Sequence, residues 1–215
     1  MNKLVIFDLD GTLLNSVSDI ADNINIMLKK FGYPERSTAE IMQFIGHGAR
    51  NLVKNSIGIG ISEQDLDERL SYYNEIYTNC GSPKTSLYNG IDELLTHLKE
   101  RDYKLAILTN KPQMTTDEVY KEYLSQYNFD MVVGQRAGKK IKPDPETVNE
   151  IIDNLKADRE NTYFVGDGEP DVQVAINAKV SGISALWGFR NRAQLEKAGA
   201  KIFALTPMDV IKFIK

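Results

Sequence analysis

The sequence predicts an α/β protein in which helices cover both faces of a parallel sheet and a helical segment is inserted into the chain. Short apolar runs of strand length alternate with segments of helical length over most of the 215 residues. Continuous apolar strands separated by helices are typical of a parallel sheet buried on both faces. One stretch, from about residue 17 to residue 79, has helical spacing only. We therefore predict a doubly wound α/β domain with a helical insertion.

Six apolar runs are candidate strands, and the first of them is followed directly by an aspartate. In chain order they are Leu4–Phe7, Leu105–Leu108, Met131–Val133, Tyr163–Val165, Ile183–Trp187 and Ile202–Leu205. We predict that the first five lie in the order 5-4-1-2-3, counted along the chain. This order places a topological switch point beside the first strand, where doubly wound sheets bind their ligands.

Five segments of helical length lie between or after the later strands, and several of them carry start signals. The segments are Thr115–Ser125, Pro145–Leu155, Pro170–Ala178, Arg192–Ala198 and Met208–Ile214. Thr115 and Glu118 have the spacing of a capping box, which predicts that the helix begins after Thr115. Pro145 and Pro170 suit the first turn of a helix.

The inserted segment shows two clear helical patterns. Apolar residues follow helical spacing from Ile20 to Phe31, and Gly32 is placed to end that helix. Ser62 with Asp65 opens a second amphipathic run. We predict a core domain of residues 1–14 and 83–215 and a helical cap domain of residues 15–82, with hinges at 11–16 and 81–86.

Composition narrows the class of protein. Lys and Arg number 26 against 30 Asp and Glu, so the net charge is −4, and the charges are scattered. This argues against a nucleic-acid or anionic-membrane surface, because both need a clustered basic face. No run approaches the ~20 apolar residues of a membrane helix. Cys80 is the only cysteine, which excludes an internal disulfide, and we predict a cytoplasmic protein.

Polar side chains follow each of the first four predicted strands, or lie in the loop beyond. They are Asp8, Asp10, Thr109, Asn110, Lys142, Asp167 and Asp171. The carboxyl ends of parallel strands meet at one edge, so we expect these groups to converge. Several ionised carboxylates in a small volume require a cation, and oxygen ligands without His or Cys favour Mg²⁺. The Thr109 hydroxyl and the Lys142 ammonium would complement a phosphate dianion.

These motifs resemble the four signature motifs of the haloacid dehalogenase-like hydrolase superfamily, in order and spread over the whole chain. They are Asp8-Leu9-Asp10-Gly11-Thr12, Thr109, Lys142 and Gly166-Asp167 with Asp171. A helical insertion between the first and second motifs resembles the C1-cap branch. Within that branch, the segments 44–50 (FIGHGAR) and 109–112 (TNKP) resemble phosphoglycolate phosphatases.

The resemblance implies a Mg²⁺-dependent phosphatase that acts on a small phosphorylated metabolite through an aspartyl-phosphate intermediate. Asp8 would be the nucleophile and Asp10 the general acid and base. Asp8, the backbone carbonyl of Asp10 and Asp167 would hold the metal, and Asp171 would support these ligands from behind. The phosphate would be bound by Thr109, Asn110 and Lys142. Substrate specificity would come from the predicted cap residues His47, Gly48 and Arg50.

The sequence leaves several points open. Gly168 replaces the serine that usually follows the family's motif aspartate, and Glu169 suggests either an exposed carboxylate or a water-mediated contact. For Lys111, a solvated surface side chain and a functional role are equally compatible with the sequence. A β-phosphoglucomutase-like mutase shares the same motifs, and a receiver-type signalling domain shares the residue types. A protein that only binds its ligand is a weaker alternative, and both a monomer and a homodimer are compatible with the sequence.

Overall fold

The computed structural model describes residues 2–58 and 60–215, except for the side chains of Asn79 and Cys80. Its main sheet has six parallel strands in the order β5-β4-β1-β6-β7-β8. Their bounds are β1 Leu4–Phe7, β4 Lys104–Pro112, β5 Met131–Gln135, β6 Thr162–Gly166, β7 Ser181–Ala185 and β8 Phe203–Ala204. The predicted order of the first five strands is confirmed, and the sixth candidate extends the sheet at the β7 edge.

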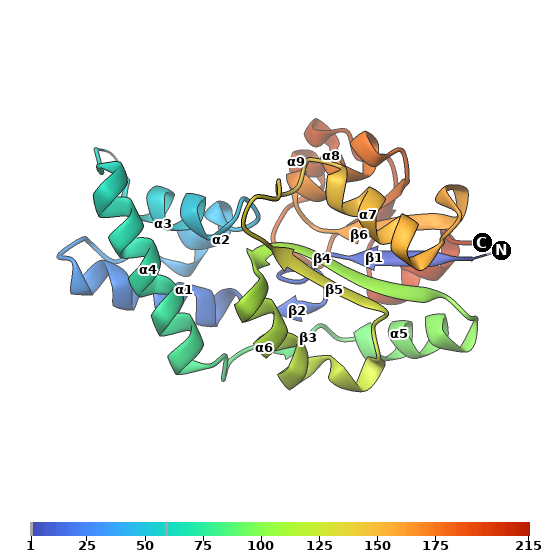
Figure 1. Ribbon diagram of the computed structural model, residues 1–215, viewed down its shortest axis with the longest axis horizontal. Coiled ribbons are helices and arrows are strands. Elements are labelled where there is room, and N and C mark those ends of the chain that lie inside the picture. The colour runs from blue at the N-terminus through green and yellow to red at the C-terminus, as the bar shows by residue number, and fades with distance from the viewer. Residues whose placement is uncertain (1, 59) are drawn as a thin grey trace.

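Helices cover both faces of this sheet (Figure 1). Alternate residues of a strand point to opposite faces, so Leu4 and Ile6 of β1 pack on one side and Val5 and Phe7 on the other. The first face packs against α7 (Glu146–Leu155) and α8 (Glu169–Ala178). The second packs against α5 (Ile91–Glu100), α6 (Gln113–Tyr123) and the 3₁₀ helix η3 (Pro207–Lys212). The α/β prediction is therefore confirmed.

The remaining elements lie at the edges of these layers. The α9 helix (Arg192–Ala198) follows β7 and packs beside α8. Two short 3₁₀ helices, η1 (Ser125–Tyr127) and η2 (Arg159–Asn161), precede β5 and β6.

Four helices form one continuous segment between β1 and β4, and we call this segment the helical block (residues 17–80). They are α1 Val17–Lys30, α2 Thr38–Phe44, α3 Ala49–Ile57 and α4 Glu63–Cys80. Figure 1 shows the helical block at one end of the sheet, beside the carboxyl end of β1. As the sequence predicts, Ser62 caps α4, because its hydroxyl accepts a hydrogen bond from the Asp65 N–H at 3.1 Å.

A two-stranded antiparallel ribbon connects the helical block to the sheet. It consists of β2 (Leu14–Asn15) and β3 (Ser86–Leu87). Beside it, the buried carboxylate of Asp19 accepts hydrogen bonds from the Lys84 N–H at 3.0 Å and the Thr85 hydroxyl at 2.6 Å. These contacts hold the two passages of the chain side by side.

Several predicted boundaries and one predicted element type differ from the structure. The α6 helix begins at Gln113, so Thr115 lies inside its first turn and donates to the Pro112 carbonyl instead of capping the helix. The fifth strand, β7, ends at Ala185, before Trp187. The C-terminal segment predicted as a helix from Met208 forms the 3₁₀ helix η3. The helices α2 and α5 were not individually predicted.

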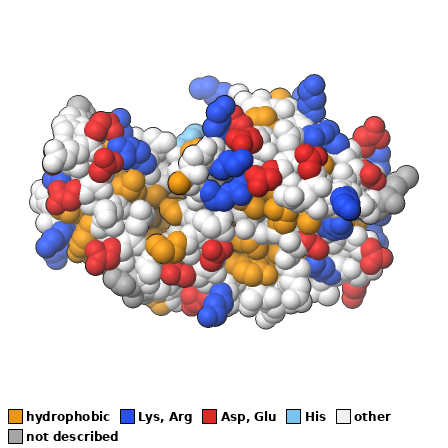
Figure 2. Space-filling view, in the orientation of Figure 1, with side chains coloured by type: hydrophobic (Ala, Val, Ile, Leu, Met, Phe, Trp, Pro, Cys, Tyr) orange, Lys and Arg blue, Asp and Glu red, His pale blue; other side chains and the backbone are white. Residues whose placement is uncertain are grey.

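The surface has no large region of one charge on the face seen in Figure 2, where acidic and basic side chains are interspersed. Within residues 2–58 and 60–215, no helix combines the length and the apolar character that a membrane crossing requires.

Candidate active site

The carboxyl ends of three adjacent strands bring the predicted site together. Phe7 at the end of β1 is level with Ile107 of β4 and Val165 of β6. The residues that follow these positions therefore leave the sheet at the same edge. Asp8 follows β1, Asp167 follows β6, and the polar residues 109–111 occupy the last part of β4.

Three buried carboxylates form a compact cluster at this edge. Oxygens of Asp8, Asp167 and Asp171 all lie within 4.8 Å of one another. Asp171 arrives from the first turn of α8, where its Oδ2 accepts a hydrogen bond from the Gly168 N–H at 2.9 Å. The Asp167 carboxylate accepts from the Thr12 hydroxyl at 2.9 Å and from the Phe189 N–H at 2.7 Å. All three orientations are thus fixed by hydrogen bonds or, for Asp8, by an ion pair.

Glycines make room for this cluster. A Cβ atom at Gly11 would lie 2.4 Å from an Asp167 oxygen, and its φ of +90° also favours glycine. A Cβ atom at Gly188 would lie 2.3 Å from the Asp167 Cβ. Gly188 was not among the predicted site residues, because it lies in a loop after β7 that has no recognisable motif.

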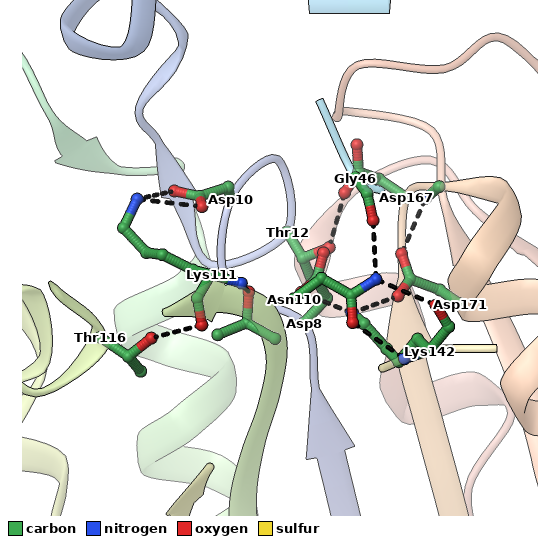
Figure 3. Close-up of polar contacts among 12 residues, drawn as sticks. Asp8, Asp10, Thr12, Gly46, Asn110, Lys111, Thr116, Lys142, Asp167 and Asp171 are labelled. Atoms are coloured by element: carbon green, nitrogen blue, oxygen red, sulfur yellow. Dashed lines mark hydrogen bonds and ion pairs between the residues drawn. The ribbon is translucent and has the colours of Figure 1, made fainter. Parts of the chain in front are cut away.

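Lys142 supplies the positive charge of the cluster (Figure 3). Its Nζ lies 2.7 Å from Asp8 Oδ1 and 2.6 Å from Asp171 Oδ1, and its side chain is only 2% exposed. Burial alone would favour the neutral amine, but the charges of Asp171 and Asp8 outweigh it and raise the pKa of Lys142. The predicted approach of Lys142 to Asp8 is what the structure shows.

The carboxylates have excess negative charge despite this lysine. Burial, with repulsion from Asp171, raises the pKa of Asp8 to about 7. Burial, with repulsion from Asp8 and Asp171, raises the pKa of Asp167 to about 8. Three carboxylates facing one ammonium group need a further cation to be ionised together. Their all-oxygen donor set fits a hard divalent cation such as Mg²⁺.

Asp10 belongs to a second, adjacent group of charges (Figure 3). Its carboxylate accepts from the Ser16 hydroxyl at 2.6 Å and pairs with Lys111 Nζ at 3.1 and 3.3 Å. Lys111 Nζ also donates to the Tyr77 hydroxyl of α4 at 2.7 Å. Burial opposes the charge of Lys111, but Asp10 and Tyr77 together raise its pKa. The solvated alternative for Lys111 is wrong, since its side chain is 7% exposed.

The two other residues at the end of β4 have different surroundings. The buried Thr109 hydroxyl accepts the Lys111 N–H at 3.3 Å and lies in the lining of the same cavity as Asp8. The Asn110 side chain bridges two loops instead. Its amide donates to the carbonyls of Gly46 and Lys142, and its oxygen accepts the Lys142 N–H at 2.9 Å. Asn110 therefore positions the Lys142 loop. A direct contact between Asn110 and the phosphate stays a prediction, and the hydrogen bonds that already occupy its side chain do not favour it.

A small cavity of about 50 Å³ lies where the helical block meets the sheet. Asp8 and Asp10 line it from the sheet, together with the residues at the end of β4. The helical block contributes mostly apolar side chains and two tyrosines, namely Ile20, Ile45, Ala49, Leu52, Tyr73 and Tyr77. A cavity of this size holds a few water molecules or a small organic group.

Of the three predicted specificity residues, only Gly48 lines this cavity. The Arg50 guanidinium is bound on the outer side of α3 by the carboxylates of Glu63 and Asp67. His47 is exposed and is not part of the cavity wall. The structure therefore does not place Arg50 or His47 where a substrate in this cavity would contact them.

Arg190 is a site residue that sequence reasoning missed. It is 5% exposed and donates to the carbonyls of Met42, Gln43 and Ile45 at the end of α2. Its Nε also pairs with Glu169 at 2.9 Å. The predicted alternative of a freely exposed Glu169 carboxylate is therefore wrong, and a water-mediated contact of Glu169 stays a prediction. Arg190 fastens the loop before α3 to the loop that carries Asp167.

Residues 5–185 match the family of haloacid dehalogenase-like hydrolases, and the chain belongs to this family. Within the family it is phosphoglycolate phosphatase-like, and its relatives support an enzyme of the phosphoric monoester hydrolase class. Phosphoglycolate phosphatase 1 of Pseudomonas aeruginosa is 31% identical over 194 residues, which cover 88% of this chain and 71% of that protein. Phosphoglycolate phosphatase of Aliivibrio fischeri is 30% identical over 195 residues, which cover 88% and 86% of the two chains.

Solved structures show the same fold over the full length. A crystal structure from Lactobacillus delbrueckii subsp. bulgaricus, of a protein itself assigned by inference as a phosphoglycolate phosphatase, superimposes with a TM-score of 0.92. It is 25% identical, and the match covers 100% of this chain and 99% of that one. A haloacid dehalogenase-like protein from Streptococcus pneumoniae has a TM-score of 0.86 at 23% identity, which supports the fold alone.

Proposed function

We propose that this enzyme hydrolyses a small, phosphoglycolate-like phosphomonoester with the help of Mg²⁺. One observation carries the proposal: the Asp8 carboxylate contacts Lys142, belongs to a cluster of three carboxylates and lines a small cavity. A nucleophile, a charge-neutralising cation and a shielded site are what phosphoryl transfer needs.

Two chemical steps follow from these positions. In the first, an Asp8 oxygen attacks phosphorus, the ester bond to the leaving oxygen breaks, and Asp10 donates a proton to that oxygen. In the second, water attacks the phosphorus of the aspartyl phosphate, Asp10 takes the proton, and the bond to Asp8 breaks to release inorganic phosphate. Lys142 and Thr109 hold the phosphoryl oxygens during both steps.

A bound Mg²⁺ would neutralise charge on the phosphoryl oxygens. Asp8, Asp167 and the backbone carbonyl of Asp10 are the proposed ligands, and Asp171 supports them through its contacts with Lys142 and Gly168. The raised pKa values of Asp8 and Asp167 support a cation at this place, because the cation would relieve the repulsion among the carboxylates.

The proposal includes the division of the chain into a core (1–14 and 83–215) and a cap (15–82). The cap would cover the site and exclude water while the phosphoryl group is transferred. We also propose a cytoplasmic enzyme whose substrate is a small metabolite, active as a monomer or a homodimer.

A phosphate-release assay tests the function. The substrates are 2-phosphoglycolate, p-nitrophenyl phosphate and β-glucose 1-phosphate, each with Mg²⁺ and with EDTA. We expect Mg²⁺-dependent phosphate release, fastest with 2-phosphoglycolate. Conversion of the glucose phosphate to an isomer without phosphate release would identify a mutase instead. A phospho-aspartate that persists for minutes after treatment with acetyl phosphate would identify a receiver-type domain.

The effect of Mg²⁺ on stability should depend on pH. The folded-state pKa values of Asp8 and Asp167, about 7 and about 8, lie above those of the unfolded chain. Between about pH 4 and pH 8 the metal-free folded state therefore binds more protons than the unfolded state, so this contribution to stability falls as the pH rises. Mg²⁺ binds the ionised carboxylates, so its stabilising effect should grow over the same range.

Thermal unfolding in EDTA and in saturating Mg²⁺ measures this effect. We expect the difference in Tm to be small near pH 5 and to reach about 5 °C or more near pH 8. Asp167→Asn is the matched variant, and it should remove most of the pH dependence. A Tm difference that stays constant from pH 5 to pH 8 would contradict the assignment of this cluster as the cation site.

A further inference from the structure

The cavity contains a single cationic side chain among the residues that are described in its lining, and this side chain is Lys111. Lys142 touches Asp8 and Asp171 on the other side of the nucleophile. Arg50, one of the residues predicted to determine substrate specificity, is held outside by two carboxylates. Among the described lining residues, Lys111 alone therefore offers a positive charge to a second negative group on the substrate.

We propose that Lys111 determines specificity by binding a carboxylate on the leaving-group side of the substrate. This inference rests on the proposed function, because it takes Asp8 as the nucleophile and Asp10 as the proton donor. Asp10 must contact the leaving oxygen, and Lys111 Nζ lies 3.1 Å from the Asp10 carboxylate. A group attached to the leaving oxygen therefore lies next to the Lys111 ammonium.

The hydrogen bonds of Lys111 leave capacity for a ligand. An ammonium group has three N–H donors. One is directed at the Tyr77 hydroxyl at 2.7 Å, and the contact with Asp10 is divided between two oxygens at 3.1 and 3.3 Å. Bonds between an ammonium and a carboxylate are normally 2.7–2.9 Å long, so the pairing with Asp10 is loose. A substrate carboxylate could add a shorter bond without displacing Tyr77.

The surroundings of Lys111 strengthen its preference for an anion. Its Nζ also lies 4.1 Å from the centre of the Tyr77 ring, which holds the ammonium beside the helical block. The apolar side chains of Ile45 and Leu52 face the same small cavity. In such a poorly hydrated space, a charge interacts strongly with a counter-charge and gains little from a neutral group.

The position of Lys111 beside Asp10 limits how far the carboxylate can lie from the ester. Asp10 and Lys111 are in direct contact, so the carboxylate must be close to the ester oxygen. The substrate class is therefore a short phosphorylated hydroxy acid with its carboxylate one or two carbons from the ester, as in 2-phosphoglycolate. Sugar phosphates carry only neutral oxygens at this distance from the ester, so they offer Lys111 no counter-charge.

The test compares two substrates that differ in this one charge, 2-phosphoglycolate and ethyl phosphate. We expect wild-type enzyme to prefer 2-phosphoglycolate, and Lys111→Met to reduce the ratio of the two kcat/KM values by about 10- to 100-fold, mainly through KM. Lys111→Arg should recover part of the preference. Lys54→Met, on the exposed surface of α3, is the matched control and should keep the wild-type ratio.

A binding measurement separates this inference from the proposed function. The Kd of both compounds is measured with Asp8→Asn, with and without Lys111→Met, and circular dichroism verifies that each variant is folded. If Asp8→Asn binds 2-phosphoglycolate more tightly than ethyl phosphate and Lys111→Met removes this preference, the inference is supported. Absence of phosphate release by the wild-type enzyme would overturn only the proposed hydrolysis. Equal preference for 2-phosphoglycolate with and without Lys111 in both assays would overturn the specificity role and leave the hydrolysis standing.

Discussion

Asp8→Asn is expected to lower kcat by about a thousandfold or more, with any phosphomonoester that the wild-type enzyme hydrolyses. The amide is close in size to the carboxylate but cannot form the acyl phosphate. Phosphate release, measured with saturating substrate and Mg²⁺, gives the loss of kcat. Intact-mass measurement after rapid acid quenching should detect the added phosphoryl group on wild-type protein and not on the variant.

The same substitution should leave the fold intact. In the metal-free protein, burial and the charge of Asp171 disfavour the ionised Asp8 carboxylate and raise its pKa to about 7. A neutral amide removes this penalty, while Lys142 keeps its contact with Asp171 at 2.6 Å. We therefore expect the Tm of Asp8→Asn in EDTA near pH 8 to equal or exceed that of wild type. Turnover above about a tenth of the wild-type value would exclude Asp8 as the nucleophile.

Arg190→Met is expected to have the largest effect on stability among the substitutions considered. The variant leaves the carbonyls of Met42, Gln43 and Ile45 without this donor and deprives Glu169 of its cation. Unsatisfied buried groups are costly, so the free energy of unfolding should fall by about 3 kcal/mol and Tm by about 6–12 °C. Chemical and thermal denaturation measure both quantities.

Arg192→Met is the matched control for Arg190→Met. The Arg192 side chain is 53% exposed and pairs with Glu196 on the surface of α9, so its loss should change stability by less than about 1 kcal/mol. Arg190→Met should also raise KM, because the loop that Arg190 holds includes Gly46 and Gly48 of the cavity wall. Equal losses of Tm in the two variants would show that the hydrogen bonds of Arg190 contribute no more than an exposed ion pair.

The strands and their order were predictable because strands that are buried on both faces of a sheet form continuous apolar runs in the sequence. Leu4–Phe7 is apolar throughout, and all four residues are fully buried. Element boundaries were less predictable, since they depend on contacts that no local pattern records. Thr115 has capping-box spacing, yet the strand β4 continues to Pro112 and the helix starts directly after it. The packing of the chain therefore overrides the local signal.

The site was predictable where its residues follow a strand directly or lie in the segment just beyond it. Asp8, Lys142, Asp167 and Asp171 lie together as expected, because the sheet order brings their strands to one edge. The contacts that cross from the helical block were not predictable. Tyr77 and Lys111 are 34 residues apart, and Arg190 is 145 residues from Ile45. Nothing in either local sequence indicates its partner, so only the assembled fold reveals these pairs.

The antiparallel ribbon of β2 and β3 limits how the helical block can move. Both passages of the chain run through this narrow ribbon, and Asp19 ties them together through Lys84 and Thr85. Any movement of the block relative to the sheet would therefore have to pass through the backbone of this ribbon. Leu14 of β2 forms a bridge with Asp10, so the backbone that carries the proposed proton donor is attached directly to this ribbon.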